Sequence, residues 1–197
     1  GHNGAGKSTT INILLGFLQP DVGTASINSI DVSSNYNLAR KCIGYIPENV
    51  SLYPYLTGKE NLDYFCKLSG KSLSQSSLSN LLNECGLENK VHQNRIDTYS
   101  KGMRQKVGIA IALAKEAKVY LLDEPTSGLD ATAALKVVNV LTNLVTRGEC
   151  LVIATIHQPR PDIYSSFGRV LLLSDGIVTY EGPPLEVVDY LNSIGHS

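Results

Sequence analysis

The sequence has little net charge, no long apolar run and no clustered cysteines. Its 17 lysines and arginines are balanced by 18 aspartates and glutamates, so the formal net charge is −1. This balance excludes the broad basic field with which many proteins attract nucleic acid, and we expect no nucleic-acid partner. No apolar stretch reaches the roughly 20 residues that a membrane-spanning helix needs. No secretory signal is recognisable either.

The four cysteines, Cys42, Cys66, Cys85 and Cys150, lie far apart and lack the spacing of a metal site. We interpret them as small buried or half-buried thiols in a reducing compartment. With 197 residues, the chain is long enough for one domain, or for one domain that carries an inserted subdomain.

What the sequence does contain is a glycine-rich loop, GHNGAGKS, which matches the pattern G-x-x-x-x-G-K-[ST] at every fixed position. Glycines let backbone N–H groups curl around a phosphate, and the N-terminus of the following helix adds positive charge. Lys7 is predicted to reach the β- and γ-phosphates, Ser8 to bind Mg²⁺ and Thr9 to contact the α-phosphate. A turn that only caps a helix would give Lys7 and Ser8 no role. The predicted nucleotide contacts in this loop are Gly1, His2, Asn3, Gly4, Ala5, Gly6, Lys7, Ser8 and Thr9.

Two carboxylates follow an apolar run in VYLLDEPTSGLD. Asp123, at the end of a predicted strand, is expected to hold the shell of Mg²⁺, and Glu124 is expected to take the proton of an attacking water. An apolar run followed by aspartate is a weak signal alone. Combined with the loop around Lys7 it becomes strong, and the Asp-Glu pair favours hydrolysis over simple binding.

The periodicity predicts an α/β protein with a mostly parallel sheet. A helix begins at Lys7 and continues past Leu18 until Pro20 and Gly23 stop it. Residues 49–115 look like a helical insert, with a capping box at Thr57, a serine-rich linker over 69–79 and a largely apolar helix from about 103. Strands or hairpins are predicted within 23–30, 42–47, 118–123, 150–156 and 169–182, of which 118–123 and 150–156 are expected to be buried strands. A last amphipathic helix follows them.

Four motifs in this order, GHNGAGKST, YSKGMRQK, LLDEPTSGLD and TIHQ, resemble the nucleotide-binding domain of ATP-binding cassette (ABC) proteins. The resemblance covers essentially the whole chain and implies a P-loop NTPase fold: a RecA-like core over 1–48 and 116–182, a helical subdomain over 49–115 and a C-terminal helix over 183–197. A GTPase would need a guanine-reading Asn-Lys-x-Asp motif, and the one Asn-Lys pair lies in NKVH.

The resemblance implies that two such domains pair head to tail, with each ATP held between the phosphate loop of one and the signature loop of the other. The usual signature is Leu-Ser-Gly-Gly-Gln. In this chain Ser100 and Gly102 match it, whereas Lys101 replaces a glycine and Met103 replaces the glutamine. Lys101 is predicted either to face solvent or to approach the partner's γ-phosphate.

Three further positions are carried over from the family. His157 matches the switch histidine at the γ-phosphate, so the predicted catalytic residues are Lys7, Glu124 and His157. Asp130 matches the loop that crosses the dimer interface, and it is also expected to cap the helix that follows it. Glu48 stands where glutamine is usual. It is predicted to contact nucleotide and, with Ser8 and Asp123, the metal.

The two parts of the chain resemble different members of the family. Residues up to about 120 look like bacterial export ATPases, whereas the part from TIHQP onward looks like the G subfamily, the White-type half-transporters. A buried strand normally precedes a phosphate loop, and Gly1 already belongs to the loop. We therefore expect a fragment that lacks the N-terminal strands, binds ATP weakly and has low stability.

The hypothesis that follows is an ATP-hydrolysing domain of a membrane exporter, at the cytoplasmic face of a membrane, with ATP and Mg²⁺ as ligands. Its expected partners are a second nucleotide-binding domain and a transmembrane domain or subunit. One alternative is a soluble ABC protein without transport. Another is an ATP-binding regulator without turnover.

Overall fold

The structure is a computed structural model that describes residues 4–148 and 150–195. Its helices are α1 (Lys7–Leu14), α2 (Tyr36–Lys41), α3 (Gly58–Leu68), α4 (Gln75–Glu84), α5 (Lys101–Ala114), α6 (Ala131–Thr146), α7 (Pro161–Tyr164) and α8 (Val187–Ser193). Its strands are β1 (Ser26–Ile27), β2 (Ile30–Asp31), β3 (Ile43–Ile46), β4 (Val119–Leu122), β5 (Leu151–Ala154), β6 (Val170–Ser174) and β7 (Ile177–Gly182).

A three-stranded parallel sheet, in the order β3-β4-β5, organises the fold. Ile46, Leu122 and Ala154 are opposite one another at the carboxyl ends of the three strands. The loops that leave these ends therefore start side by side, at the edge where open α/β sheets place their ligands. The expected mixed α/β fold with a parallel sheet is confirmed.

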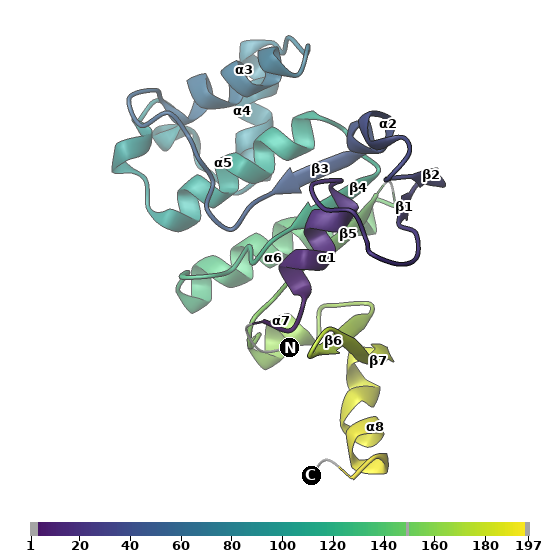
Figure 1. Ribbon diagram of the computed structural model, residues 1–197. Helices are drawn as coiled ribbons and strands as arrows, with labels where there is room; N and C mark the ends of the chain where they lie inside the picture. The colour runs from purple at the N-terminus through teal and green to yellow at the C-terminus, as the bar shows by residue number, and fades with distance from the viewer. Residues whose placement is uncertain (1–3, 149, 196–197) are drawn as a thin grey trace.

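The side chains of β4 are buried on both faces of the sheet, which explains their continuous apolar run. Tyr120 and Leu122 face the larger core, which the helices α3, α4, α5 and α6 form against the sheet. Val119 and Leu121 face a smaller core together with α1, α2 and the β1–β2 hairpin. Figure 1 shows α1 on one side of the strands and the helices α3, α4 and α5 on the other.

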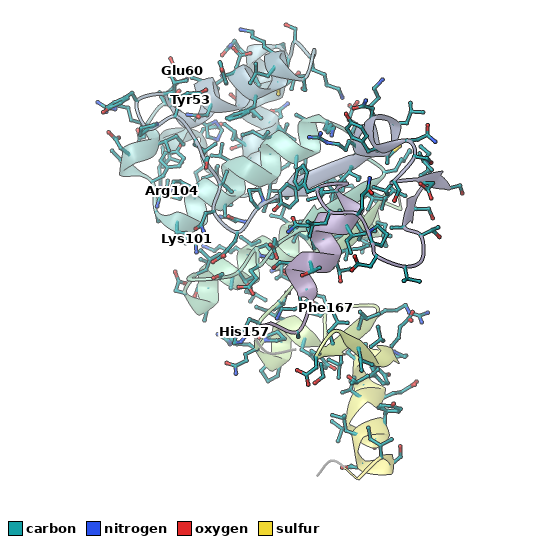
Figure 2. The ribbon with its side chains drawn as sticks, viewed as in Figure 1. Tyr53, Glu60, Lys101, Arg104, His157 and Phe167 are labelled. Carbon is teal, nitrogen blue, oxygen red and sulfur yellow. The ribbon has the colours of Figure 1, made fainter. Side chains whose placement is uncertain are left out.

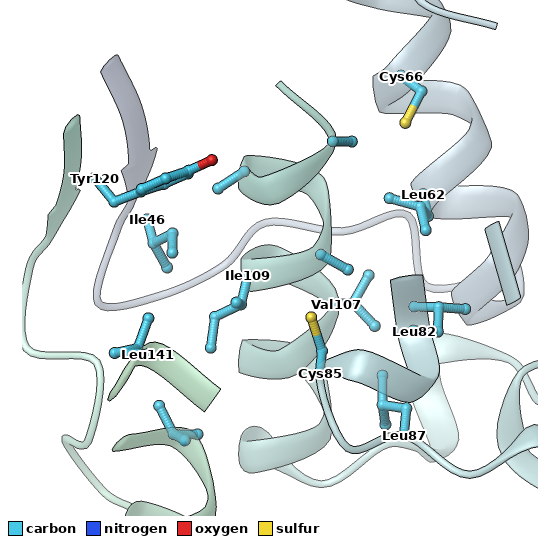
Figure 3. Close-up of a cluster of buried hydrophobic side chains, with 14 of the residues drawn as sticks. Ile46, Leu62, Cys66, Leu82, Cys85, Leu87, Val107, Ile109, Tyr120 and Leu141 are labelled. Atoms are coloured by element: carbon cyan, nitrogen blue, oxygen red, sulfur yellow. The ribbon is translucent and has the colours of Figure 1, made fainter. Parts of the chain in front are cut away.

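Helix α5 runs through the middle of the larger core. Ile109 packs toward Ile46 and Tyr120 of the sheet, and Val107 packs toward Leu62 of α3 (Figure 3). Residues 107–110 of α5 are all buried, as its apolar sequence predicts. Helix α5 therefore connects α3 and α4 to the sheet.

A buried amide holds the loop that enters the helical segment. Asn61 is 0% exposed, and its Oδ1 accepts the N–H of Tyr53 at 2.8 Å. Its Nδ2 donates to the carbonyl oxygens of Tyr53 and Thr57. The predicted capping box is present, because the Thr57 hydroxyl accepts from Glu60 N–H and the Glu60 carboxylate accepts from Thr57 N–H.

Three local predictions differ from the structure. Helix α1 ends at Leu14 rather than near Pro20, because Gly16 takes a left-handed φ of 72° and closes a Schellman turn with the carbonyl of Ile13. The serine-rich stretch is only partly a linker: Ser74 caps α4, and the serines after it lie in that helix. Helix α5 begins at Lys101, two residues earlier than predicted.

Strand β5 was predicted to be fully buried, and it is not. Leu151 is 55% exposed and Ile153 is 38% exposed, because β5 is an edge strand and the smaller core, which covers Val119 and Leu121 on the same face of the sheet, does not extend to it. The β6–β7 hairpin is antiparallel, as predicted, and lies with α8 at the end of the molecule away from the helical segment (Figure 1). No helix within the described residues is long and apolar enough to span a membrane.

Candidate functional site

A pocket of about 310 Å³ lies at the N-terminus of α1. Its lining is residues 4–9, the described part of the phosphate loop, together with Glu124. Gly4 and Gly6 have left-handed φ values of 85° and 99°, which residues with a side chain rarely adopt. The loop therefore turns its backbone toward the pocket at the positive end of a helix, the arrangement that suits a phosphate group.

Ser8 and Asp123 meet at the side of this pocket. The Ser8 hydroxyl donates to Asp123 Oδ1 at 3.3 Å, although the two residues come from α1 and from the end of β4. A hydroxyl beside a carboxylate suits Mg²⁺, which prefers oxygen ligands and keeps several waters and phosphate oxygens in its shell. The described residues contain no cluster of three or more acidic, histidine or cysteine side chains for an all-protein metal site. The pair therefore fits a metal that arrives with a nucleotide.

Glu124 lies on the wall of the pocket in a strained backbone conformation. Its φ is 46°, which is unfavourable for a residue with a side chain, and such strain often marks functional sites. Its backbone N–H donates to the hydroxyl oxygen of Thr155 at 2.8 Å, and this hydrogen bond holds the turn after β4 to the end of β5. Glu124, the predicted base, therefore lines the same pocket as the phosphate loop.

Thr155 is a site residue that the sequence reasoning missed. Its hydroxyl accepts from Glu124 N–H and donates to Asp123 Oδ1 at 2.7 Å, so one side chain holds both carboxylate-bearing residues. Its own N–H donates to the carbonyl of Leu122 and continues the β4–β5 pairing. A hydroxyl residue at the end of β5, level with Asp123, was the available signal. Burial, and secondly the charge of Asp123, raises the pKa of Tyr45 on the neighbouring strand β3.

Ser100, Gly102 and Asp130 lie at the starts of two helices outside this pocket. Ser100 caps α5, because its hydroxyl oxygen accepts the N–H of Met103 at 3.2 Å. A Cβ placed on Gly102 would meet Ala133 at 3.4 Å, an ordinary contact, so packing within the chain does not require glycine there. Asp130 caps α6 through Oδ1, as expected. Their roles toward a second molecule stay predictions.

His157 and Glu48 do not line the pocket of the phosphate loop. His157 is exposed in the turn after β5 (Figure 2). Glu48 Oε1 accepts from the Ser127 hydroxyl at 2.9 Å and lies 3.9 Å from the amine of Lys101. Lys101 is 34% exposed, so it is neither fully solvated nor free of a partner in its own chain.

The structure thus brings together only part of the predicted site. Lys7, Ser8 and Glu124 line one pocket and Asp123 contacts Ser8 at its side, whereas His157 and Glu48 do not line it. The metal-binding role of Glu48 therefore has no support from its contacts, and it stays a prediction. The predicted contacts of Gly1, His2 and Asn3 lie outside the described residues.

Comparisons with known proteins agree with the motifs. The family profile described as "ABC transporter" matches residues 1–127. The ABC transporter G family member 4 of Arabidopsis thaliana is 39% identical over 186 residues, which are 92% of this chain and 32% of that protein. The chain thus spans about a third of the length of this relative.

Solved structures of ATP-binding cassette proteins have the same fold as this chain. The ATP-binding cassette MJ0796, described as a post-hydrolysis dimer bound to ADP and Pi, matches with a TM-score of 0.78 and 26% identity, over 93% of this chain and 82% of that one. The protein cbiO1 from Clostridium perfringens, described as part of the ABC transporter complex cbiONQ, matches with a TM-score of 0.81 and 25% identity, over 98% and 79% of the two chains. The phosphate loop, the paired carboxylates and these matches together show that the chain belongs to the ABC transporter family, as a nucleotide-binding domain similar to those of the G subfamily.

Proposed function

We propose that the chain binds Mg–ATP in the pocket of the phosphate loop and hydrolyses it to drive transport. The observation that carries this proposal is the composition of the pocket, which has the loop over residues 4–9 and Glu124 in one lining. The contact between Ser8 and Asp123 at 3.3 Å adds a pair of oxygen ligands beside it.

In this mechanism the backbone of the loop and Lys7 hold the phosphates, and the N-terminus of α1 stabilises their negative charge. Ser8 and Asp123 would hold Mg²⁺, which would supply charge neutralisation to the bound phosphates. The Glu124 carboxylate takes the proton of the attacking water. His157, on the loop after β5, is proposed to approach the γ-phosphate when nucleotide is bound.

A second copy would complete the site. Ser100 and Gly102 begin α5, a helix of 14 residues whose N-terminus carries partial positive charge. In a head-to-tail pair, Ser100 of the partner subunit would meet the γ-phosphate, and Asp130 would lie at the interface. The dimeric MJ0796 cassette supports this arrangement by analogy.

The helical insert, proposed to span 49–115 between the core segments 1–48 and 116–182, would transmit closure to a transmembrane partner. The loop before α3 carries exposed tyrosines: Tyr55 is 78% exposed, and Tyr53, labelled in Figure 2, is 47% exposed. Tyr53 packs edge-on against Tyr64 of α3, with 4.9 Å between the ring centres. Aromatic residues of this kind are enriched in protein interfaces. We place the chain at the cytoplasmic face of a membrane and propose export as the direction of transport.

Replacing Glu124 with Gln tests the proposed hydrolysis. Loss of the general base is expected to lower kcat by about 10²–10⁴-fold while nucleotide binding persists. Phosphate release measures turnover, and gel filtration with and without Mg–ATP measures dimer formation. The E124Q variant is expected to accumulate an ATP-dependent dimer, because it closes on nucleotide that it cannot cleave.

Glu116 gives a matched control, because it has the same left-handed conformation with φ 54° and lies away from the pocket. Glu116→Gln is expected to keep wild-type turnover. Unchanged turnover in E124Q would remove Glu124 as the base, and a monomer at saturating Mg–ATP would remove the head-to-tail pair. A wild-type protein that binds nucleotide without turnover would favour the regulator.

A further inference from the structure

The two positions at which this chain departs most visibly in charge from the usual family residues lie against each other. Glu48 stands where glutamine is usual and Lys101 stands where glycine is usual. The structure places Lys101 Nζ 3.9 Å from Glu48 Oε1, although one residue follows β3 and the other begins α5. Figure 2 shows Lys101 and Arg104 at the start of that helix.

Both side chains also lie against the turn that follows Glu124, and Glu48 is hydrogen-bonded to it. The Ser127 hydroxyl donates to Glu48 Oε1 at 2.9 Å, the same oxygen that faces Lys101. Lys101 lies over Gly128: a Cβ built on this glycine would be 3.1 Å from Lys101 Nζ and 3.5 Å from its Cδ. The pair therefore joins the loop after β3, the start of α5 and the turn after the predicted base.

Arg104 lies near the pair but has a different partner. It lines the same cavity of about 100 Å³ as Glu48 and Lys101. Its guanidinium donates to the carbonyl oxygen of Tyr99 at 2.6 Å. Lys101 is therefore the side chain that supplies the ion pair to Glu48.

The ion pair is too exposed to be explained by stability of the fold. The side chains of Lys101 and Glu48 are 34% and 42% exposed, and pairs of this kind add little to folding free energy. The ion pair is expected to matter more for binding of a nearby anion. Without the lysine, the Glu48 carboxylate next to the Glu124 turn would repel a highly negative triphosphate. Lys101 offsets that charge from a position outside the lining of the phosphate-loop pocket.

We infer that Lys101 is a positioning residue that supplies the counter-charge of Glu48. It keeps this carboxylate on Ser127 and cancels its field, so that a chain with glutamate at this position still accepts Mg–ATP. The inference rests on the proposed function, since it concerns the affinity of the same pocket. It assigns the unusual signature lysine to its own protomer rather than to the partner's nucleotide.

A double-mutant cycle on nucleotide affinity tests this inference. The four proteins are wild type, K101M, E48Q and E48Q/K101M, titrated by calorimetry with Mg²⁺ and the non-hydrolysable analogue adenylyl imidodiphosphate. Removing the lysine charge is expected to weaken binding about three- to tenfold beside Glu48, and the loss should shrink at high salt. In the E48Q background the same change should alter affinity by less than about twofold.

Two variants separate this role from a merely structural one. Lys101→Arg keeps the charge and should keep the affinity. Lys71 has matched exposure, 32%, and pairs with Glu116 at 2.6 Å, so Lys71→Met should leave nucleotide affinity unchanged. An equal loss for K101M in both backgrounds, or no loss beside Glu48, overturns the inference. A wild-type protein that does not bind the analogue overturns the proposed function instead.

Discussion

Replacing Thr155 with valine is the sharpest test of how the site is assembled. Valine keeps the shape of the side chain and removes the hydroxyl that donates to Asp123 Oδ1 at 2.7 Å and accepts from Glu124 N–H at 2.8 Å. The hydroxyl thus fixes the carboxylate that is predicted to bind the metal and the predicted base together.

The size of the effect follows from these two bonds. A hydrogen bond to a charged group contributes about 1.5–3 kcal/mol, and an unpaired buried N–H costs about 1–3 kcal/mol. Thr155 is only half-buried, so water replaces part of both, and we expect a loss of about 2 kcal/mol in the free energy of unfolding. The left-handed Glu124, whose strain amounts to about 1–3 kcal/mol, would then relax out of position.

Turnover is expected to fall by about 10- to 100-fold, with a higher Mg²⁺ concentration needed for half-maximal rate, since each 1.4 kcal/mol of barrier is about tenfold. The assay is steady-state ATPase activity across an Mg²⁺ titration, combined with urea unfolding. Thr155→Ser keeps the hydroxyl and should stay within about threefold of wild type. Wild-type turnover and an unchanged Mg²⁺ requirement in T155V would refute the positioning role of this hydroxyl.

Two further predictions concern the core. A Cβ on Gly108 would lie 2.7 Å and 2.9 Å from the two methyl carbons of Val50, so Gly108→Ala should lower the free energy of unfolding, measured in urea, by about 1–3 kcal/mol. In a Val50→Ala background the same substitution should cost much less, because the methyl groups are gone. Equal losses in the two backgrounds would contradict the clash. Burial raises the pKa of the Cys85 thiol from about 9 to about 12, so the folded state keeps its proton longer than the unfolded state. The contribution of the protonated thiol to the free energy of unfolding is fully present below pH 9. It decreases as the pH rises from 9 toward 12, by about 1.4 kcal/mol per pH unit. Urea midpoints at pH 8 and pH 10 should therefore fall more for wild type than for Cys85→Ala, and parallel falls would remove the effect.

The features that the sequence predicted well are local or repeat at short range. The phosphate loop combines its glycines, Lys7 and Ser8 within a few residues, and the left-handed Gly4 and Gly6 lead directly into α1, which begins at Lys7 as predicted. Strand β4 is apolar throughout because a core covers each of its faces. The capping box at Thr57 is likewise complete within four residues.

The features that escaped prediction depend on contacts between distant segments. Thr155 gains its role only when β5 pairs with β4, and the Glu48–Lys101 pair forms only when α5 lies beside the loop after β3. The serine-rich linker was drawn too long because Leu78 and Leu82, both buried, outweigh the poor helix propensity of the serines around them. The apolar composition of residues 150–156 predicted the strand β5 correctly, but it did not indicate that β5 lies at an edge of the sheet.

The way Ser100 caps α5 has a consequence for the chemistry that this position can present. One lone pair of its oxygen is occupied by Met103 N–H, which leaves the hydroxyl proton as the group that can point outward. A short acidic side chain would cap the same helix equally well, yet would turn an attractive surface into a repulsive one for any incoming anion. Capping of α5 alone therefore does not distinguish serine from aspartate at this position, whereas an anion bound at this helix start would favour serine.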